Sequence, residues 1–420
     1  MTESWWFSAM CRRTPNMRKI AIAAAEEKAV IGILAFEIAS LMSKVVSLWH
    51  CLGHNQIILL KEEIKHSSGI RKLVSENDNY LMDLAIAEII QNLTYVAKSV
   101  ARLGKRCSDP IYHSLEGVFD DPFDVIDLNW LGWAYKLKKM ERKVKKMERF
   151  MAVTAQLYQE SEVLDHYEQD LIIRRRRRRK RNVNQVKLIE FQKRQRQEVN
   201  YLRELSPWIR TYDYTVRLLL RSLFTIVERI KQLIRSNQHK WKLLLNGSRS
   251  PSSFSTTTLG HAALAHLYAN IVILIEKLAY SSSDESDRLI AFDDEEDRED
   301  LYNMLPATVR RSLRLRLKIK LFETTSGYLS LQQVRKKLEW LAPLAHETIK
   351  WQFERNIEKQ RMAPCLNVFL VKTLYFADRM KTEAEIVELL IGLSYISRYG
   401  RKLNENASLN VEKAALILIE

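Results

Sequence analysis

The 420-residue sequence contains little glycine, proline or cysteine: 11 Gly, 8 Pro and 4 Cys. Because turns between short strands draw on Gly and Pro, their scarcity disfavours a β-rich fold, and the abundant Leu, Ala, Lys, Arg and Glu favour helices. The cysteines lie far apart and form no CxxC pair, which indicates reduced thiols of a cytosolic or nuclear protein: Cys11, Cys51, Cys107 and Cys365. No apolar run reaches the roughly 20 residues that cross a bilayer, so we expect no transmembrane segment.

Motifs for enzymatic chemistry are also missing. The sequence has no GxGxxG or GxxxxGK[ST] run to hold a nucleotide, and no nucleophile-elbow or kinase motif. His261 and His266 are five residues apart, about 140° around a helix, so they do not share a metal-binding face. Glu37, Glu88 and Glu276 lie in or beside apolar helical stripes, where pairing with a Lys or Arg is more common than acid–base catalysis. We therefore predict a protein that is not an enzyme and that holds no cofactor and no metal.

Helical periodicity is the main feature that the sequence does have. Apolar residues recur at spacings of three and four over residues 31–52 and again from Asp78 to Leu103, which predicts an N-terminal bundle. A third such stripe, Val216–Ile234, predicts another helix. In the last third of the chain we expect four more helices, over residues 301–321, 331–361 with a bend at Pro343, 363–376 and 382–399.

A different period appears in the middle of the chain. Eight residues alternate at spacings of four and three, which predicts a supercoiled helix: Trp133, Leu137, Met140, Val144, Met147, Met151, Thr154 and Tyr158. Five later residues predict a returning arm: Val186, Ile189, Val199, Leu202 and Leu205. Together they predict a long helical hairpin, and the alternative is a long ordinary bundle helix.

The predicted fold class is all-α, with helical bundles joined by a long coiled-coil-like helical hairpin. The expected organisation is as follows: a flexible N-terminus over 1–25, an N-terminal helical domain over 26–108, the hairpin with its basic tip over 123–245, a Ser/Thr-rich linker over 246–258, a C-terminal helical domain over 259–400 and a tail over 401–420.

The net charge of +16 is concentrated in this middle part. Residues 136–149 hold eight basic and two acidic residues, and residues 174–203 hold thirteen basic and two acidic residues. The second segment begins with eight consecutive cations, the candidate nuclear-import or anion-binding run: Arg174, Arg175, Arg176, Arg177, Arg178, Arg179, Lys180 and Arg181. Such a run cannot be buried, so it serves an import receptor, nucleic-acid phosphates or an anionic membrane surface, or it is a solvated tip.

A second basic stripe, between Arg310 and Lys320, follows the acidic segment 284–300. The acidic segment could fold over the basic helix as a strap, or both could be solvated segments of opposite sign, since surface ion pairs are weak.

The run 258–277 predicts the start of a helix, with Thr258 as its cap and small residues such as Gly260 that let another helix approach closely. This run resembles the opening of the C-terminal conserved domain of the plant phytosulfokine-simulator (PSK SIMULATOR) family. Six other segments resemble the same family in the same order: residues 31–44, 97–109, 138–149, 300–306, 339–346 and 373–379. The arginine run departs from the family pattern.

The resemblance implies a plant protein that promotes growth and has paired N-terminal and C-terminal domains without agreed catalytic or ligand residues. We predict a non-enzymatic regulatory or scaffold protein of growth signalling that acts through protein partners, with an import receptor among them, and that lies in the nucleus. The alternatives are a nucleic-acid-associated nuclear protein, or a peripheral membrane adaptor in the cytoplasm or at the inner face of the plasma membrane.

Overall fold

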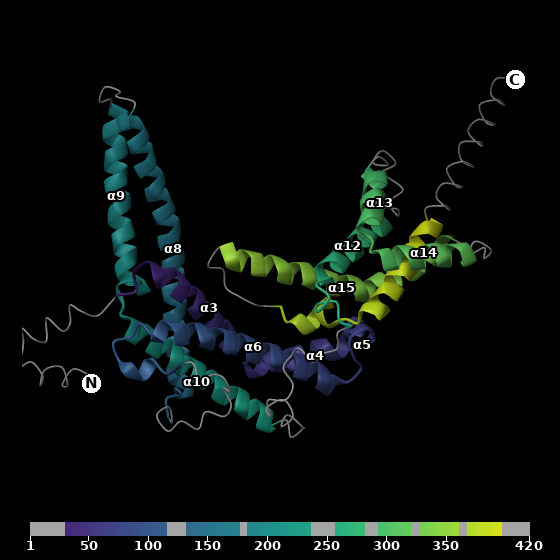
Figure 1. Cartoon of the computed structure of the whole chain (residues 1–420), viewed down its shortest axis with the longest axis horizontal. Helices are drawn as coiled ribbons and strands as arrows, with labels where there is room; N and C mark the ends of the chain where they lie inside the picture. Colours follow the sequence, from purple (N-terminus) through teal and green to yellow (C-terminus); the bar gives the residue numbers. More distant parts are fainter. Residues whose placement is uncertain are drawn as a thin grey trace, which may run out of the picture. The chain divides into compact units, whose positions relative to one another are not determined.

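The computed structural model describes residues 30–115, 132–176, 183–236, 257–281, 293–320, 327–360 and 368–396. Over these residues the fold is all-α, as predicted: it consists of helices, short 3-10 turns and two isolated β-bridges, with no strand (Figure 1). The chain divides into two compact units, and neither is a continuous stretch of sequence. The first unit takes residues 1–53, 90–240 and 358–365, and the second takes residues 54–89, 241–357 and 366–420.

The first unit is built around α3 (Ala35–Cys51), the C-terminal part of α6 (Asp78–Gly104) and α10 (Tyr212–Ser236). It also contains α8 (Leu137–Arg176), α9 (Val183–Leu205) and three short 3-10 helices: η1 (Gly32–Leu34), η2 (Pro110–Tyr112) and η4 (Pro207–Ile209). The helix predicted over residues 31–52 is therefore confirmed as η1 followed by α3. Ten side chains of α3 are buried, because its apolar residues recur at helical spacing and face their neighbours in this unit.

One feature of α3 differs from the sequence expectation. The segment Gly32–Cys51 is, by length and composition alone, long and apolar enough to cross a membrane. In this fold 56% of its most apolar stretch is buried, and Glu37 pairs with Arg102 of α6. Burial and a paired charge are what a core helix of a folded unit requires.

The predicted hairpin is present, because α8 and α9 lie side by side and run in opposite directions (Figure 1). Leu157 and Leu164 of α8 pack with Val199 and Leu202 of α9. Four of the inward positions predicted on α8 are buried: Met140, Val144, Met147 and Thr154. The supercoil itself stays a prediction.

The prediction is wrong at both ends of the α8 seam. Leu137 is 60% exposed and Tyr158 is 42% exposed, whereas Leu157 is fully buried. A strict repeat of seven residues drifts around a helix of 3.6 residues per turn, so the buried face moves from one position to its neighbour along α8. In the returning arm, Val186, Ile189 and Leu205 are exposed.

The second unit contains α4 (His54–His66), α5 (Ser68–Leu73) and the N-terminal part of α6. Its other helices come from the last third of the chain: α12 (Ala265–Ser281), α13 (Asp293–Met304), α14 (Ala307–Lys320), α15 (Gly327–Gln360), the 3-10 turns η6 (Leu370–Lys372) and η7 (Leu374–Phe376), and a helix over residues 379–396. One apolar cluster joins all these elements, with Tyr268 among its fully buried side chains.

The helix start predicted at Thr258 is wrong, because α12 begins at Ala265. Residues 258–264 instead form turns, held by backbone hydrogen bonds from Leu259 N–H to the Ala377 carbonyl and from Gly260 N–H to the Tyr375 carbonyl. Gly260 does permit a close approach, but to a ring and not to a helix: a Cβ there would lie 2.5 Å from the ring of Tyr375.

Two other helix predictions are corrected. The helix expected over 301–321 is two helices, α13 and α14, because Pro306 lies between them and lacks the N–H that a continuous helix needs. Of the helix expected over 363–376, the described part forms the 3-10 turns η6 and η7. Helices α4 and α5 were not predicted from the sequence.

Candidate functional site

The candidate arginine run lies between the two arms of the hairpin. Arg174, Arg175 and Arg176 are the last residues of α8, and α9 begins at Val183. Arg177, Arg178, Arg179, Lys180 and Arg181 lie outside the described residues. In the sequence the run thus lies between the end of α8 and the start of α9, and its place at the tip and its role stay predictions.

Polar contacts hold the arms together between the apolar core and the run. Gln195 of α9 donates from Nε2 to the Glu160 carboxylate at 2.5 Å and to the Glu160 backbone carbonyl at 3.0 Å. Arg196 pairs with Glu168 at 2.7 Å, and both side chains are more than a third exposed. Exposed pairs of this kind contribute about 0–1 kcal/mol each. In the far half of the hairpin, weak polar pairs thus accompany one buried apolar side chain of α8, Leu171.

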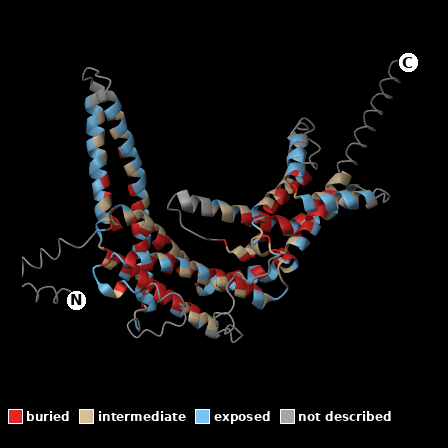
Figure 2. Cartoon of the chain, in the orientation of Figure 1, coloured by how far each residue is buried: buried red, intermediate tan, exposed pale blue. Residues whose placement is uncertain are grey.

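Exposed apolar side chains lie close to the run on both arms. Ile172 and Ile173 precede it on α8, Val186 and Ile189 follow it on α9, and all four are between 45% and 61% exposed. Figure 2 shows that the far half of α8 and α9 is largely exposed. Apolar groups gathered next to strong positive charge are typical of a surface that another molecule covers. We call these four residues the apolar tip.

The three interior acids predicted from the sequence have structural contacts. Glu37 pairs with Arg102, as expected for an acid on an apolar helix face. The Glu88 carboxylate accepts a hydrogen bond from the backbone N–H of Leu370 at 2.8 Å, which satisfies a donor at the start of η6. Glu276 lies 2.7 Å from the His346 ring.

The histidines and cysteines are likewise in structural surroundings. His266 contacts the Asn270 side chain one turn along α12, while His261 lies in the turns before that helix. The described residues contain no group of three or more potential metal ligands. Burial, followed by the charges of Asp213 and Asp109, raises the pKa of the Cys107 thiol to about 12. Cys51 is half-buried, while Cys11 and Cys365 lie outside the described residues.

A buried polar network centred on Glu383 was not predicted from the sequence. Tyr268 Oη donates to the Glu383 carboxylate at 2.6 Å, Arg379 Nε at 2.8 Å and Thr308 Oγ1 at 3.1 Å. Burial alone would raise the pKa of Glu383, but the three donors outweigh it and the pKa is lowered. The network joins α12 and α14 to the helix over 379–396. Only the spacing of four between Arg379 and Glu383 is visible in the sequence.

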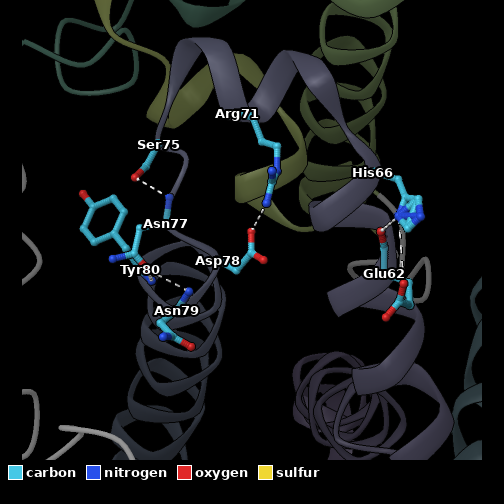
Figure 3. Close-up of polar contacts among 8 residues, drawn as sticks. All are labelled: Glu62, His66, Arg71, Ser75, Asn77, Asp78, Asn79 and Tyr80. Atoms are coloured by element: carbon cyan, nitrogen blue, oxygen red, sulfur yellow. Dashed lines mark hydrogen bonds and ion pairs between the residues drawn. The ribbon is translucent and has the colours of Figure 1, made fainter.

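A second polar cluster fixes the connection between α5 and α6 (Figure 3). Asn77 caps α6 by accepting from the N–H groups of Asn79 and Tyr80, and Arg71 of α5 pairs with Asp78 at 2.5 Å. Ser75 Oγ in turn accepts from the Asn77 N–H. These contacts determine where α6 begins, and they leave the cluster with a structural role.

The acidic segment and the second basic stripe make contacts that the strap interpretation did not specify. Asp297 of the acidic helix α13 pairs with Lys277 of α12 at 2.6 Å. Within the basic stripe, Arg314 donates to Tyr302 Oη, and Arg316 pairs with Glu388. All these side chains belong to the second unit, so their contacts help to stabilise that unit.

Two regions of the chain match known protein families. Residues 33–89 match a domain of unknown function, DUF3475, and residues 258–350 match a protein family of unknown function, DUF668. The first region spans η1 to the start of α6 and the second spans the turns before α12 to α15. The first region contributes to both compact units. No solved structure matches the chain.

Three curated proteins of Arabidopsis thaliana are similar to most of the chain. PSK SIMULATOR 1 is 28% identical over 395 residues, which cover 87% of this chain and 56% of that protein. PSK SIMULATOR 2 is 26% identical over 419 residues, 94% of this chain and 64% of that protein. PSK SIMULATOR 3 is 28% identical over 388 residues, 87% of this chain and 56% of that protein. The chain thus spans less than two thirds of the length of these relatives.

Proposed function

The chain is a homologue of the PSK SIMULATOR proteins, and on this premise we propose that it is a non-enzymatic regulatory or scaffold protein of plant growth that acts through protein–protein contacts. The similarity over 87–94% of the chain carries the growth assignment. The apolar tip supports the mode of action, because it supplies exposed apolar side chains on both arms of the hairpin, next to the arginine run in the sequence.

We assign the arginine run to nuclear import, because short basic runs are the segments that import receptors read. Replacement of residues 174–181 by alternating Ser and Gln removes eight charges and no residue of the described cores. A fluorescent fusion of this variant is expected to move from the nucleus to the cytoplasm, with unchanged circular dichroism. A wild-type protein that lines the cell periphery and becomes diffuse in the variant would instead make the run a membrane contact.

Proximity labelling in plant cells tests the scaffold role. The test variant replaces Ile172, Ile173, Val186 and Ile189 by Ser, and the control replaces Val163 and Tyr201, which are exposed on the same hairpin farther from the run. A defined set of labelled proteins is expected to disappear in the test variant and to persist in the control. Identical labelling of all three proteins would remove the hairpin from the proposal. Salt-sensitive retention on DNA or RNA would favour the nucleic-acid alternative.

A further inference from the structure

A second concentration of positive charge lies far from the arginine run, where the start of α8 packs beside α10. Lys139, Arg142, Lys143 and Lys146 are spaced by three and four, so they share one face of α8. Arg217 and Arg221, spaced by four, lie on α10. We call these six residues the α8–α10 basic patch.

Mutual effects on pKa indicate that the six cations lie close together. Burial lowers the pKa of the half-buried Lys143, and four other members of the patch lower it further: Lys146, Lys139, Arg221 and Arg142. Desolvation by burial raises the pKa of Tyr135, and Arg221 and Arg217 oppose part of this rise. The two helices therefore hold their charges around a common centre next to Tyr135.

Aromatic rings contact three of these cations: Lys139, Lys146 and Arg221. The Arg221 guanidinium lies 4.4 Å from the centre of the Tyr135 ring, and Lys139 Nζ lies 5.8 Å from the same ring. Lys146 Nζ lies 5.0 Å from the ring of Tyr214. Arg221 also donates from Nε to the backbone carbonyl of Trp133 at 2.8 Å. The cations are thus held in place by rings and by a carbonyl, none of which neutralises their charge.

Two of the acidic side chains near the patch are engaged elsewhere, while Glu141 of α8 acts electrostatically on Arg229 of α10. Asp213 of α10 accepts hydrogen bonds from the backbone N–H groups of Ser108 and Asp109. Glu148 of α8 contacts His50. Within the part of the chain that the structure describes, none of the six cations forms an ion pair. Among the described residues these six cations therefore lack an acidic partner, and like charges that lie close together repel one another.

The dimensions of the patch select among anions. The row on α8 covers eight residues, about 10 Å along the helix, and the row on α10 covers five residues, about 6 Å. The first turn of α8, which begins at Leu137, adds the positive end of a helix dipole. Charges that converge from two helices within about 10 Å suit several phosphates on one small molecule better than the extended phosphate track of a duplex.

We propose that the α8–α10 basic patch binds a compact anion that carries several phosphates, either a free polyphosphorylated molecule or a phosphoinositide headgroup. The ligand bridges the two helices and offsets the repulsion among Lys139, Lys143 and Lys146. This site uses neither the apolar tip nor the arginine run, so it stands independently of the proposed scaffold role.

The test measures binding of inositol hexakisphosphate to the full chain by calorimetry at physiological salt. Both the wild-type chain and the chain without the arginine run serve as backgrounds, because that run also attracts phosphates. The patch variant is Lys139→Gln, Lys143→Gln, Lys146→Gln. The control is Lys138→Gln, Lys145→Gln, Arg149→Gln, which removes the same charge from a face of α8 about 90° away.

We expect the patch variant to bind at least about tenfold more weakly and the control less than about threefold more weakly, in both backgrounds. Without ligand, the patch variant is expected to melt close to the wild type, because the repulsion that it loses offsets the lost contacts of Lys139 and Lys146 with aromatic rings. Pelleting with phosphatidylcholine vesicles that contain phosphatidylinositol 4,5-bisphosphate separates the two ligand sources. Retention on vesicles that the patch variant loses identifies a headgroup, and soluble binding alone identifies a free polyphosphate.

Three results would overturn the proposal. The first is absence of inositol hexakisphosphate binding in the chain that lacks the arginine run. The second is an equal loss in the patch and control variants, which would indicate general charge attraction. The third is tighter binding of a DNA duplex at equal phosphate concentration, lost in the patch variant, which would make the patch a nucleic-acid surface.

Discussion

Neighbouring positions on α8 experience opposite environments. Met147 is completely buried, whereas Glu148 is exposed and contacts His50 at 3.3 Å. Met147→Asp places a carboxylate among apolar side chains and is expected to cost about 3–5 kcal/mol of unfolding free energy. Glu148→Gln is expected to stay within about 0.5 kcal/mol. Thermal unfolding of both variants checks this, and equal melting temperatures would contradict the inward position of Met147.

Gly69 of α5 packs directly against α15. A Cβ at this position would lie 2.3 Å from Leu344 Cδ1 and 2.5 Å from the Trp340 carbonyl oxygen, and the carbonyl belongs to a helix backbone that cannot yield easily. Although alanine favours helices, Gly69→Ala is expected to destabilise the second unit by about 1–3 kcal/mol. Ser68→Ala, at the exposed neighbouring position, provides the control. Urea unfolding that ranks Gly69→Ala as stable as the control would show that the two helices can separate at little cost.

The Glu383 network predicts a dependence on pH. The folded pKa of Glu383 is below its ordinary 4.5, so ionisation stabilises the fold above that value. This contribution is lost as the pH falls below about 4.5 through the folded pKa. At pH 7, Glu383→Gln is expected to cost about 1–3 kcal/mol, because Tyr268, Thr308 and Arg379 lose a charged acceptor.

Urea unfolding at pH 7, 5 and 4 checks this dependence. The difference between the wild type and Glu383→Gln is expected to shrink as the pH falls. Glu62→Gln, which removes an exposed carboxylate, should show no comparable trend. A constant difference across the three pH values would mean that the Glu383 charge does not stabilise the fold.

At the scale of elements, the hairpin combines a firm base with a weakly held end. Leu164 belongs to its small apolar core, while Glu168 and Arg196 nearer the run form an exposed ion pair. Leu164→Ala is expected to cost about 2–4 kcal/mol. The loss of stability should be local. Hydrogen exchange is therefore expected to accelerate in the part of α8 after residue 160 and in α9, and to stay unchanged in the second unit.

Glu162→Ala, an exposed change on the same helix, is the matched control and should leave exchange unaltered. Acceleration throughout the chain after Leu164→Ala would mean that the hairpin unfolds only together with everything else.

Whether an element could be predicted from the sequence depended on how its apolar face was buried. Helices α3, α6 and α10 bury a broad stripe of their own, so their spacing alone identified them. In contrast, α4 buries only Leu60 and Ile64, too few positions to form a recognisable pattern. The turns before α12 could not be predicted because their hydrogen-bond acceptors, Tyr375 and Ala377, lie more than a hundred residues away.

The candidate site shows the same limit. The arginine run is visible as composition, and the hairpin that carries it follows from the spacing of residues such as Met140 and Val144. The α8–α10 basic patch is only half visible, since the row on α8 is a local pattern and the partners Arg217 and Arg221 come from a distant helix. Polar groups brought together by tertiary packing leave no periodic signal.

At the scale of the whole molecule, the two compact units do not coincide with the two regions that match known families. The core of the second unit includes Leu60, Ile64, Ile70 and Leu73, which precede the DUF668 region by nearly two hundred residues. A fragment of residues 246–420 therefore lacks part of its core and is expected to bind hydrophobic dyes and to melt without a cooperative transition. Co-expression with residues 54–108 is expected to restore a cooperative transition, whereas residues 132–236 should not. Cooperative melting of the fragment alone would show that it folds without α4 and α5.

Because the second unit is made of segments that are far apart in the sequence, it cannot complete its core until late in synthesis on the ribosome. The polypeptide emerges from its N-terminus, so α4 and α5 are complete long before the helices that cover them, which begin at Ala265. At roughly 5–20 residues per second, the interval of about 190 residues lasts on the order of ten to forty seconds. Throughout that time Leu60, Ile64, Ile70 and Leu73 lack the partners that the last third of the chain contributes to their cluster. The nascent chain therefore exposes an apolar segment, and we expect a chaperone to bind this segment until translation is nearly finished.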